Sequence, residues 1–233
     1  MPQVQGQGEG LTRATEITRR LRVAYGIDEP ERHEEDDPVG ALVGTILSQH
    51  TSDVNSDRAY DSMLSRFPTW EAVRTAPEGE LAASIRSGGL ANLKARRIKR
   101  CLDAIVERFG GLDLSSLAGA DLDEARARLR ELPGVGPKTA ACVLLFSLGR
   151  PAIPVDTHVH RVSRRLGLIG PKTSAEAAHA ELERVVRPED AYAFHVGLVT
   201  HGRRVCRAGR PLCSLCPLTD LCDAYLGVAG AAG

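Results

Sequence analysis

The sequence predicts an all-α protein, and three observations carry this prediction. Apolar residues recur at helical spacing through most of the 233 residues, and no segment shows the alternating pattern of a β-strand. In the middle of the chain, the stretch LPGVGPKTA (132–140) places two glycines between two helical patterns, as in a helix–hairpin–helix. Near the end, four cysteines fall in a segment of seventeen residues that has little room for regular structure.

Apolar spacing and turn residues together place the individual helices. The pattern at 39–47 is apolar almost all round, which indicates a fully buried helix. The polar, glycine-rich residues 1–10 and the last residues, 226–233, are expected to be flexible tails. The expected helices cover approximately residues 11–25, 39–47, 53–67, 70–77, 78–86, 93–109, 122–132, 137–148, 157–166, 177–186 and 192–200.

The glycine hairpin is followed by a lysine in the first turn of a helix. A turn built on Gly134 and Gly136 would point backbone N–H groups outward, which suits an anion such as a phosphate. Pro137 fits the first helical position. Lys138 then faces the positive end of the helix dipole, which favours the neutral amine, the form that acts as a nucleophile. An ordinary turn between helices, or a lysine that only touches phosphate, fits the same residues.

An aspartate follows this helix at a short distance. Asp156 comes after Pro154-Val155 and precedes a helical pattern, so it is expected to be an N-cap. Capping alone would justify the residue. A carboxylate and a lysine that frame one anion-binding turn form a more specific arrangement.

The overall charge is balanced, whereas its distribution is not. Thirty basic and thirty acidic residues give a net charge of zero, which is unexpected for a protein that binds nucleic acid. The segment 28–37 holds seven acidic residues and one basic residue, and it is expected to be a linker. Without this segment, the rest of the chain carries a net charge of +6. Basic residues gather at 94–100, 161–165 and 203–210, which favours a phosphate track over separate solvated faces.

The cysteine segment predicts a metal centre. Cys206, Cys213, Cys216 and Cys222 have the spacing C-x6-C-x2-C-x5-C. Two disulfides would need an oxidising compartment, and the chain shows no export signal and no apolar run long enough to span a membrane. Zinc sites usually show two close cysteine pairs, and only one CxxC occurs here. An iron–sulfur cubane accepts four thiolates from one compact loop.

LPGVGPKTA together with VDTHVHRV (155–162) resembles the endonuclease III family of helix–hairpin–helix DNA glycosylases, and the likeness runs from about residue 11 to residue 222. It implies two helical domains with a DNA-binding cleft between them, one of residues 38–150 and one of residues 11–37 with 151–225. The cysteine spacing matches the family's [4Fe–4S] loop at every interval, so the resemblance implies that cluster as the cofactor.

The resemblance also implies DNA contacts. In this family a segment LSxQxTD supplies a glutamine that enters the space left by a flipped nucleotide. Here the segment reads LSQHTSD (47–53), so that Gln49 comes one place early and His50 falls on the glutamine position; which of them fills the gap stays open. Leu90, before a helix with the apolar stripe Leu93 to Phe109, matches the family's leucine wedge but would equally fit a core position. The expected contacts are Gln49, His50, Asp53, Leu90, Gly134, Gly136, Thr139 and Arg161.

The implied activity is base excision. Lys138 would attack C1′ of the sugar and expel a damaged base, and Asp156 would keep the lysine neutral or stabilise the cationic sugar. A lysine–sugar Schiff base then allows β-elimination, so the family's bifunctional glycosylase/AP lyase activity on oxidised pyrimidines such as thymine glycol is expected. The expected partner is duplex DNA with damaged bases or abasic sites, bound by a monomer in the cytoplasm at the nucleoid, without a membrane. The alternatives are a monofunctional or mismatch-specific glycosylase, and a non-catalytic iron–sulfur protein that binds DNA.

Overall fold

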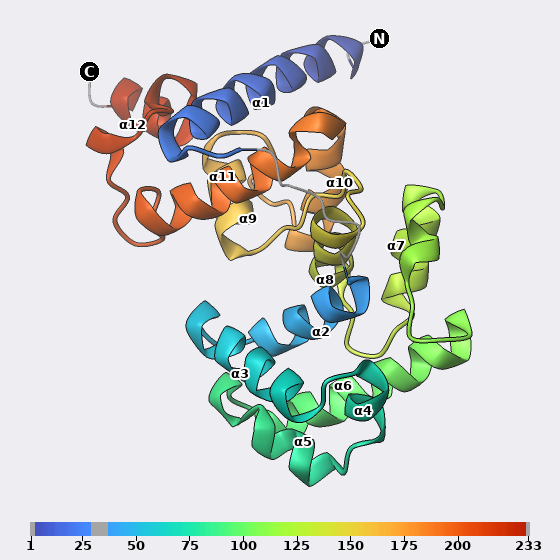
Figure 1. Ribbon diagram of the computed structural model, residues 1–233. Helices are drawn as coiled ribbons and strands as arrows, with labels where there is room; N and C mark the ends of the chain where they lie inside the picture. Colours follow the sequence, from blue (N-terminus) through green and yellow to red (C-terminus); the bar gives the residue numbers. More distant parts are fainter. Residues whose placement is uncertain (1–2, 29–36, 232–233) are drawn as a thin grey trace. The chain divides into compact units, whose positions relative to one another are not determined.

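A computed structural model describes residues 3–28 and 37–231 (Figure 1). All regular structure within these ranges is helical, which confirms the all-α prediction. The chain forms two compact units, Met1–Arg32 with Pro151–Gly233 and His33–Arg150. The division expected from the sequence differs by assigning residues 33–37 to the first of these units.

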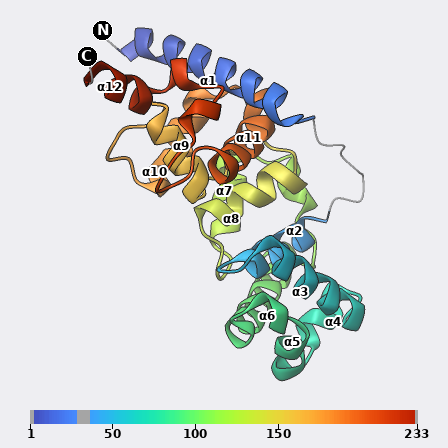
Figure 2. The same cartoon turned by 90° about the vertical axis from the view of Figure 1, so that its left-hand side faces the viewer.

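The unit that holds both ends of the chain is built around one central helix. α11 (Ala191–Arg204) contacts α1 (Gln3–Tyr25) and also α9 (Thr157–Arg165) (Figures 1 and 2). Gly197 makes the close approach of α1 possible, because a Cβ at this position would lie 2.9 Å from Leu21 Cβ. α10 (Ala175–Val185) contacts α1 and α9, and α12 (Asp223–Ala231) contacts α9.

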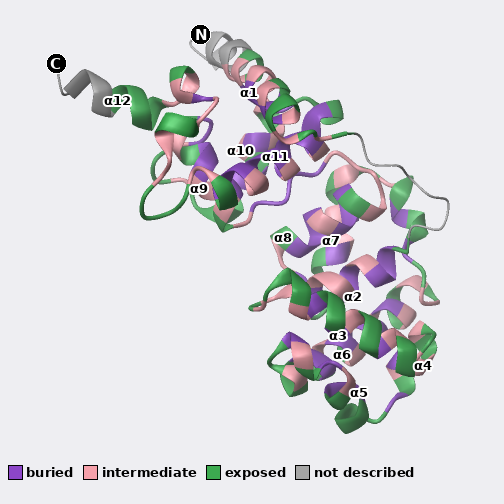
Figure 3. Cartoon of the chain, turned by 60° about the vertical axis from the view of Figure 1, so that its left-hand side comes forward, coloured by how far each residue is buried: buried purple, intermediate pink, exposed green. Residues whose placement is uncertain are grey.

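The other unit surrounds a buried helix. α2 (Pro38–Ser48) contacts the helices α3, α6 and α8, and most of its apolar residues are buried (Figure 3). The sequence predicts burial on all sides, whereas Ala41, Gly44 and Thr45 are half-buried and line a surface pocket. The other α-helices of this unit are α3 (Asp53–Arg66), α4 (Trp70–Thr75), α5 (Glu78–Ser84), α6 (Ala91–Phe109), α7 (Leu122–Arg130) and α8 (Pro137–Cys142).

The helix after the hairpin widens in its second half. α8 continues as a π-helical turn over Val143–Ser147, in which Leu148 N–H donates to Val143 O at 3.0 Å. Gly149 follows with a φ of 62°, a conformation that favours glycine and ends the helix. The helix predicted over 137–148 is therefore confirmed.

The structure differs from the sequence prediction at the two ends of the chain. Residues 3–10 belong to α1 and residues 226–231 belong to α12, whereas the sequence predicts flexible ends. Extending a helix that already exists adds one hydrogen bond for each residue fixed, so weak helix formers next to a stable helix can join it. Residues 29–36, most of the predicted acidic linker, lie outside the described residues. In the described ranges, every helix is too short or too polar to cross a bilayer.

Candidate functional site

The glycine hairpin joins α7 to α8, as expected, but its two glycines differ. Gly134 has a φ of 83°, which requires glycine. Gly136 has a φ of −91° and therefore needs no glycine for its conformation. A Cβ at Gly136 would meet no atom within 4 Å, and no side chain caps the N-terminus of α8. The glycine thus keeps an open approach to the backbone at the start of the helix.

Lys138 is the second residue of α8 and is exposed to solvent. The amine is thus available at an accessible helix N-terminus, as the sequence predicts. Its neighbour Thr139 is a correction, because its side chain is buried with 5% exposure and offers little surface to DNA. The third position of this helix faces the apolar core, whereas the second faces solvent.

A buried lysine ties two loops together in the same unit. Lys94, on α6, is 1% exposed, and burial lowers its pKa. Its Nζ donates to Leu47 O at 2.6 Å and to Gly88 O at 2.8 Å. Leu47 precedes the predicted Gln49–His50 segment and Gly88 precedes Leu90, so one side chain fixes both predicted DNA-contacting loops.

Arg97, one turn further along α6, connects the same region to the hairpin. Its Nη1 donates to Gln49 Oε1 at 3.0 Å, and its Cδ would lie 3.7 Å from a Cβ at Gly134. The sequence favours a phosphate track for the basic residues at 94–100, but several of them are bound to groups of the protein itself. Lys94 binds buried carbonyls, and Lys99 donates to Ala76 O at 2.6 Å.

His50 and Leu90 have strained backbones. They are the two non-glycine residues with positive φ in the described ranges, at 55° and 49°. Such strain persists where the surrounding structure imposes it, often at functional sites. His50 is exposed and Leu90 is 55% exposed, which excludes the core position for Leu90. Leu93, the first residue of the apolar stripe that the sequence shows on this helix, is 43% exposed, so both leucines lie at the surface.

Replacing Lys94 by methionine is expected to destabilise the fold. The variant keeps a similar volume but leaves the Leu47 and Gly88 carbonyls buried without their donor. Each unsatisfied buried group costs about 1–3 kcal/mol, so the free energy of unfolding in urea should fall by roughly 2–5 kcal/mol. Arg96→Met, on the exposed face of the same helix, should change it by less than about 0.5 kcal/mol. Equal stability of the two variants would contradict the structural role of Lys94.

Asp156 caps α9 in the other unit, which confirms its predicted position. Its Oδ1 accepts from Val159 N–H at 2.7 Å. The segment before it is buried and held by two histidines that the sequence did not single out for this role. His179 Nδ1 donates to Ile153 O at 2.9 Å, and His195 Nδ1 donates to Pro154 O at 2.8 Å. The carboxylate therefore stands on a fixed backbone.

The four predicted cysteine ligands line one cavity of about 350 Å³ in the same unit as Asp156. All four are free thiols, so the disulfide alternative is not realised. Arg165 Nη1 lies 3.3 Å from Cys206 Sγ, and Leu218 N–H donates to Cys216 Sγ at 3.4 Å. Burial raises the pKa of the Cys216 and Cys222 thiols. The Leu218 N–H at the Cys216 sulfur opposes this rise, because a donor stabilises the thiolate, the form in which cysteine binds metal.

Arg161, expected to contact DNA, makes contacts within the protein instead. Its guanidinium donates to Gly202 O at 2.9 Å and to Cys206 O at 3.0 Å, so it joins α9 to the start of the cysteine segment. These two carbonyls accept N–H groups of Arg161 for which the family resemblance implies a contact to DNA. A surface arginine and an arginine that caps a neighbouring helix look alike in a sequence, because the difference lies in tertiary contacts.

The hairpin between α7 and α8 places the chain in the class of helix–hairpin–helix proteins. Residues 43–188 match the family model described as HhH-GPD superfamily base excision DNA repair protein. This range contains Lys138 and Asp156 but ends before the four cysteines.

Curated relatives and solved structures narrow the assignment. Endonuclease III of Thermotoga maritima is 36% identical over 91% of either chain, and endonuclease III of Bacillus subtilis is 36% identical over 79% of this chain and 80% of its own length. A trapped endonuclease III–DNA covalent intermediate superposes with a TM-score of 0.78 at 28% identity, covering 94% of this chain and 98% of that one. The chain therefore belongs to the endonuclease III family, and it is a base-excision-repair enzyme of the DNA glycosylase/AP lyase class.

Proposed function

We propose that the protein removes oxidised pyrimidines of the thymine glycol type from duplex DNA and then nicks the strand through a Schiff base on Lys138. The observation that carries this proposal is the exposed Lys138 in the first turn of α8, next to the open backbone at Gly136. A phosphate bound at this helix N-terminus would hold the sugar–phosphate chain beside the amine.

The chemistry follows from the residue types. The neutral amine of Lys138 attacks C1′, the bond between C1′ and the base nitrogen breaks, and the base leaves with the electron pair and takes up a proton. The C1′–O4′ bond then breaks, O4′ takes up a proton as a hydroxyl, and a protonated imine remains between Lys138 and C1′. The protonated imine acidifies the C2′ proton; its loss forms a C2′=C3′ bond and breaks the C3′–O bond, so that the 3′ phosphate leaves with the electron pair. The carboxylate of Asp156 stabilises the cationic sugar or receives the proton of the attacking amine.

DNA binding is part of this proposal. Endonuclease III has been solved in a non-covalent DNA complex, which superposes on this chain with a TM-score of 0.77. A glycosylase must take its target base out of the stack, and exposed apolar residues such as Leu90 can wedge the duplex open. Damaged DNA as the substrate, and a monomer as the active form, belong to the same proposal.

The structure favours His50 over Gln49 as the residue that fills the gap left by the flipped nucleotide. Gln49 Oε1 is engaged by Arg97 at 3.0 Å, whereas His50 stands exposed at a strained backbone position. Replacing Gln49 would therefore disturb the contact to Arg97, and replacing His50 would remove a group that faces outward.

His50→Ala is expected to slow base release and to weaken the dependence of the rate on the base opposite the lesion. A lost hydrogen bond is worth about 1 kcal/mol, roughly a fivefold change in rate. Single-turnover rates on thymine glycol opposite each of the four bases measure the effect, with Gln49→Ala as the matched neighbour. A preference for the opposite base that changes only in Gln49→Ala would reverse the assignment.

We also propose a [4Fe–4S] cluster, which members of this family generally carry, as the occupant of the cysteine cavity. The four cysteines line one cavity of about 350 Å³, and four thiolates from one compact loop are the donor set that such a cluster takes. Bound there, the cluster would order the loop.

Protein purified without air should contain about four iron and four sulfide per chain if the cluster is present. Cys216→Ser should reduce the iron content sharply, while Cys101→Ser, at a buried cysteine on α6, should leave it unchanged. Zinc in place of iron in the wild-type protein would overturn the cofactor proposal.

A panel of duplexes tests the substrate. Release of thymine glycol with a nick at the same site is the expected result. Release of the base without a nick would indicate a monofunctional enzyme, and activity confined to mismatched normal bases would indicate the mismatch-specific alternative.

A further inference from the structure

A tyrosine of the N-terminal helix is linked to one of the four cysteines through a single imidazole. His201, on α11, is 1% exposed, and its Nε2 lies 3.5 Å from Cys216 Sγ. Its other ring nitrogen, Nδ1, lies 2.7 Å from the hydroxyl of Tyr25, the last residue of α1. The three groups form a chain from α1 to the cavity wall.

The chemistry of the end groups fixes the direction of the hydrogen bonds. A cysteine that binds metal is a thiolate and can only accept. A neutral imidazole has one N–H, and a phenol can donate to the nitrogen that lacks it. With a neutral imidazole, both contacts are therefore satisfied only when Tyr25 donates to Nδ1 and Nε2–H donates to Cys216 Sγ. Without the hydroxyl, the proton is free to move to Nδ1 and the sulfur loses its donor.

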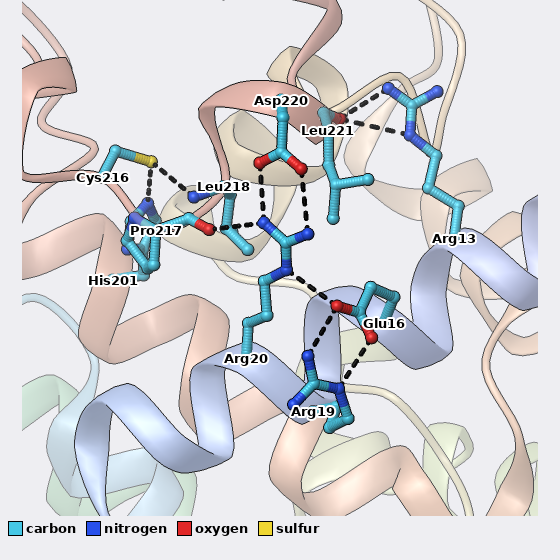
Figure 4. A network of polar contacts seen from close by, with 10 residues as sticks. All are labelled: Arg13, Glu16, Arg19, Arg20, His201, Cys216, Pro217, Leu218, Asp220 and Leu221. Carbon is cyan, nitrogen blue, oxygen red and sulfur yellow. Dashed lines mark hydrogen bonds and ion pairs between the residues drawn. The ribbon is translucent and has the colours of Figure 1, made fainter.

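The position of α1 on the cysteine segment is fixed independently of Tyr25 (Figure 4). Arg20 donates to Pro217 O at 3.0 Å and to Asp220 Oδ2 at 2.9 Å. Arg13 Nε donates to Leu221 O at 3.2 Å. Both arginines thus bind the stretch between the third and fourth cysteines. The contact between the Tyr25 hydroxyl and His201 is therefore made from a helix, α1, that is held in place by other residues.

We propose that Tyr25 is a positioning residue that acts through His201 to raise the reduction potential of the metal centre held by the four cysteines. This inference rests on the cluster assigned under the proposed function. Hydrogen bonds to ligand sulfurs are one of the main determinants of cluster potential. Because reduction adds negative charge, a donor at sulfur stabilises the reduced state more, and losing the donor makes the potential more negative. Cys216 receives two such donors, His201 and Leu218 N–H.

The test is the reduction potential of Tyr25→Phe, measured by protein-film voltammetry after iron and sulfide have been quantified. The substitution keeps the ring, whose centroid lies 6.1 Å from that of His201, and removes only the hydroxyl. A more negative potential at unchanged iron content is expected. Tyr225→Phe is the matched control, because Tyr225 lines the same cavity, and its potential should equal that of the wild type.

A double-mutant cycle shows whether Tyr25 acts through the imidazole. In a His201→Gln background, Tyr25→Phe should cause no further shift, and independent, additive shifts would overturn the inference. An unchanged potential in iron-loaded Tyr25→Phe, or an equal shift in Tyr225→Phe, would do the same while leaving the cluster proposal intact. Wild-type protein that holds zinc and no iron would overturn both.

Discussion

Lys138→Ala is expected to abolish strand cleavage at abasic sites while leaving the fold intact. The side chain is exposed in the first turn of α8, so its removal disturbs no buried contact. Loss of a covalent nucleophile lowers the rate by roughly 10⁴-fold or more, because no other group supplies the bond to C1′. Single-turnover nicking of a duplex with one abasic site measures this loss, and thermal unfolding checks the fold.

The chain supplies its own control for this experiment. The sequence GPKT occurs twice, at 136–139 and at 170–173, and Lys172 is exposed like Lys138. Lys172 lies in a turn before α10, whereas Lys138 lies within a helix. Lys172→Ala should nick DNA at the wild-type rate. Full activity of Lys138→Ala, or an equal loss in Lys172→Ala, would contradict the assignment of the nucleophile.

Asp156→Asn is expected to separate the two roles of this residue. Asparagine is a good N-cap and can still accept from Val159 N–H, so stability should change little. The carboxylate charge is lost, and a positioned acid–base or electrostatic group is worth about 10²–10⁴-fold in rate. Asp156→Ala should lose the same activity and in addition about 1 kcal/mol of stability. Nicking rates and urea unfolding of both variants measure the two effects.

Asp121→Asn is the matched control for the cap. Asp121 caps α7 by accepting from Asp123 N–H at 2.9 Å, and it lies in the other unit. Its replacement should affect neither activity nor, by more than a few tenths of a kcal/mol, stability. If Asp156→Asn kept wild-type activity, the residue would be a cap and nothing more.

The helices and the positions of Lys138 and Asp156 at helix starts were predictable because each has a local signal. Long apolar periods end at glycines such as Gly149, and Pro137 and Asp156 occupy positions that short-range rules define. These signals depend on residues within one turn of each other. The structure therefore confirms the hairpin, the helix start at Pro137 and the N-cap.

Contacts between distant segments were not predictable. Lys94 and Arg97 follow the same amphipathic pattern as the exposed arginines beside them, yet they bind Leu47 and Gln49, more than forty residues away. Arg161 likewise binds the carbonyl of Cys206, forty-five residues away. No periodicity in a single sequence distinguishes a basic side chain that binds a carbonyl from one that is free for phosphate.

The backbone strain at the two predicted DNA-contacting loops also lies beyond sequence patterns. Leucine is not a typical left-handed residue, and histidine is found there more often than most residues but still in a minority of cases, so neither side chain by itself indicates a positive φ at position 50 or 90. Close before each of these two residues, a backbone carbonyl is held by the amine of Lys94, at Leu47 and at Gly88. This fixation supports the view that the exposed side chains of His50 and Leu90 are presented to a partner.

Borohydride trapping followed by peptide mapping tests the central claim most directly. The wild-type protein is incubated with a thymine glycol duplex and borohydride, the adduct is digested, and the modified lysine is located by mass spectrometry. The account predicts one covalent adduct, on the peptide that contains Lys138. An adduct on another amine, or base release without any adduct, would contradict it.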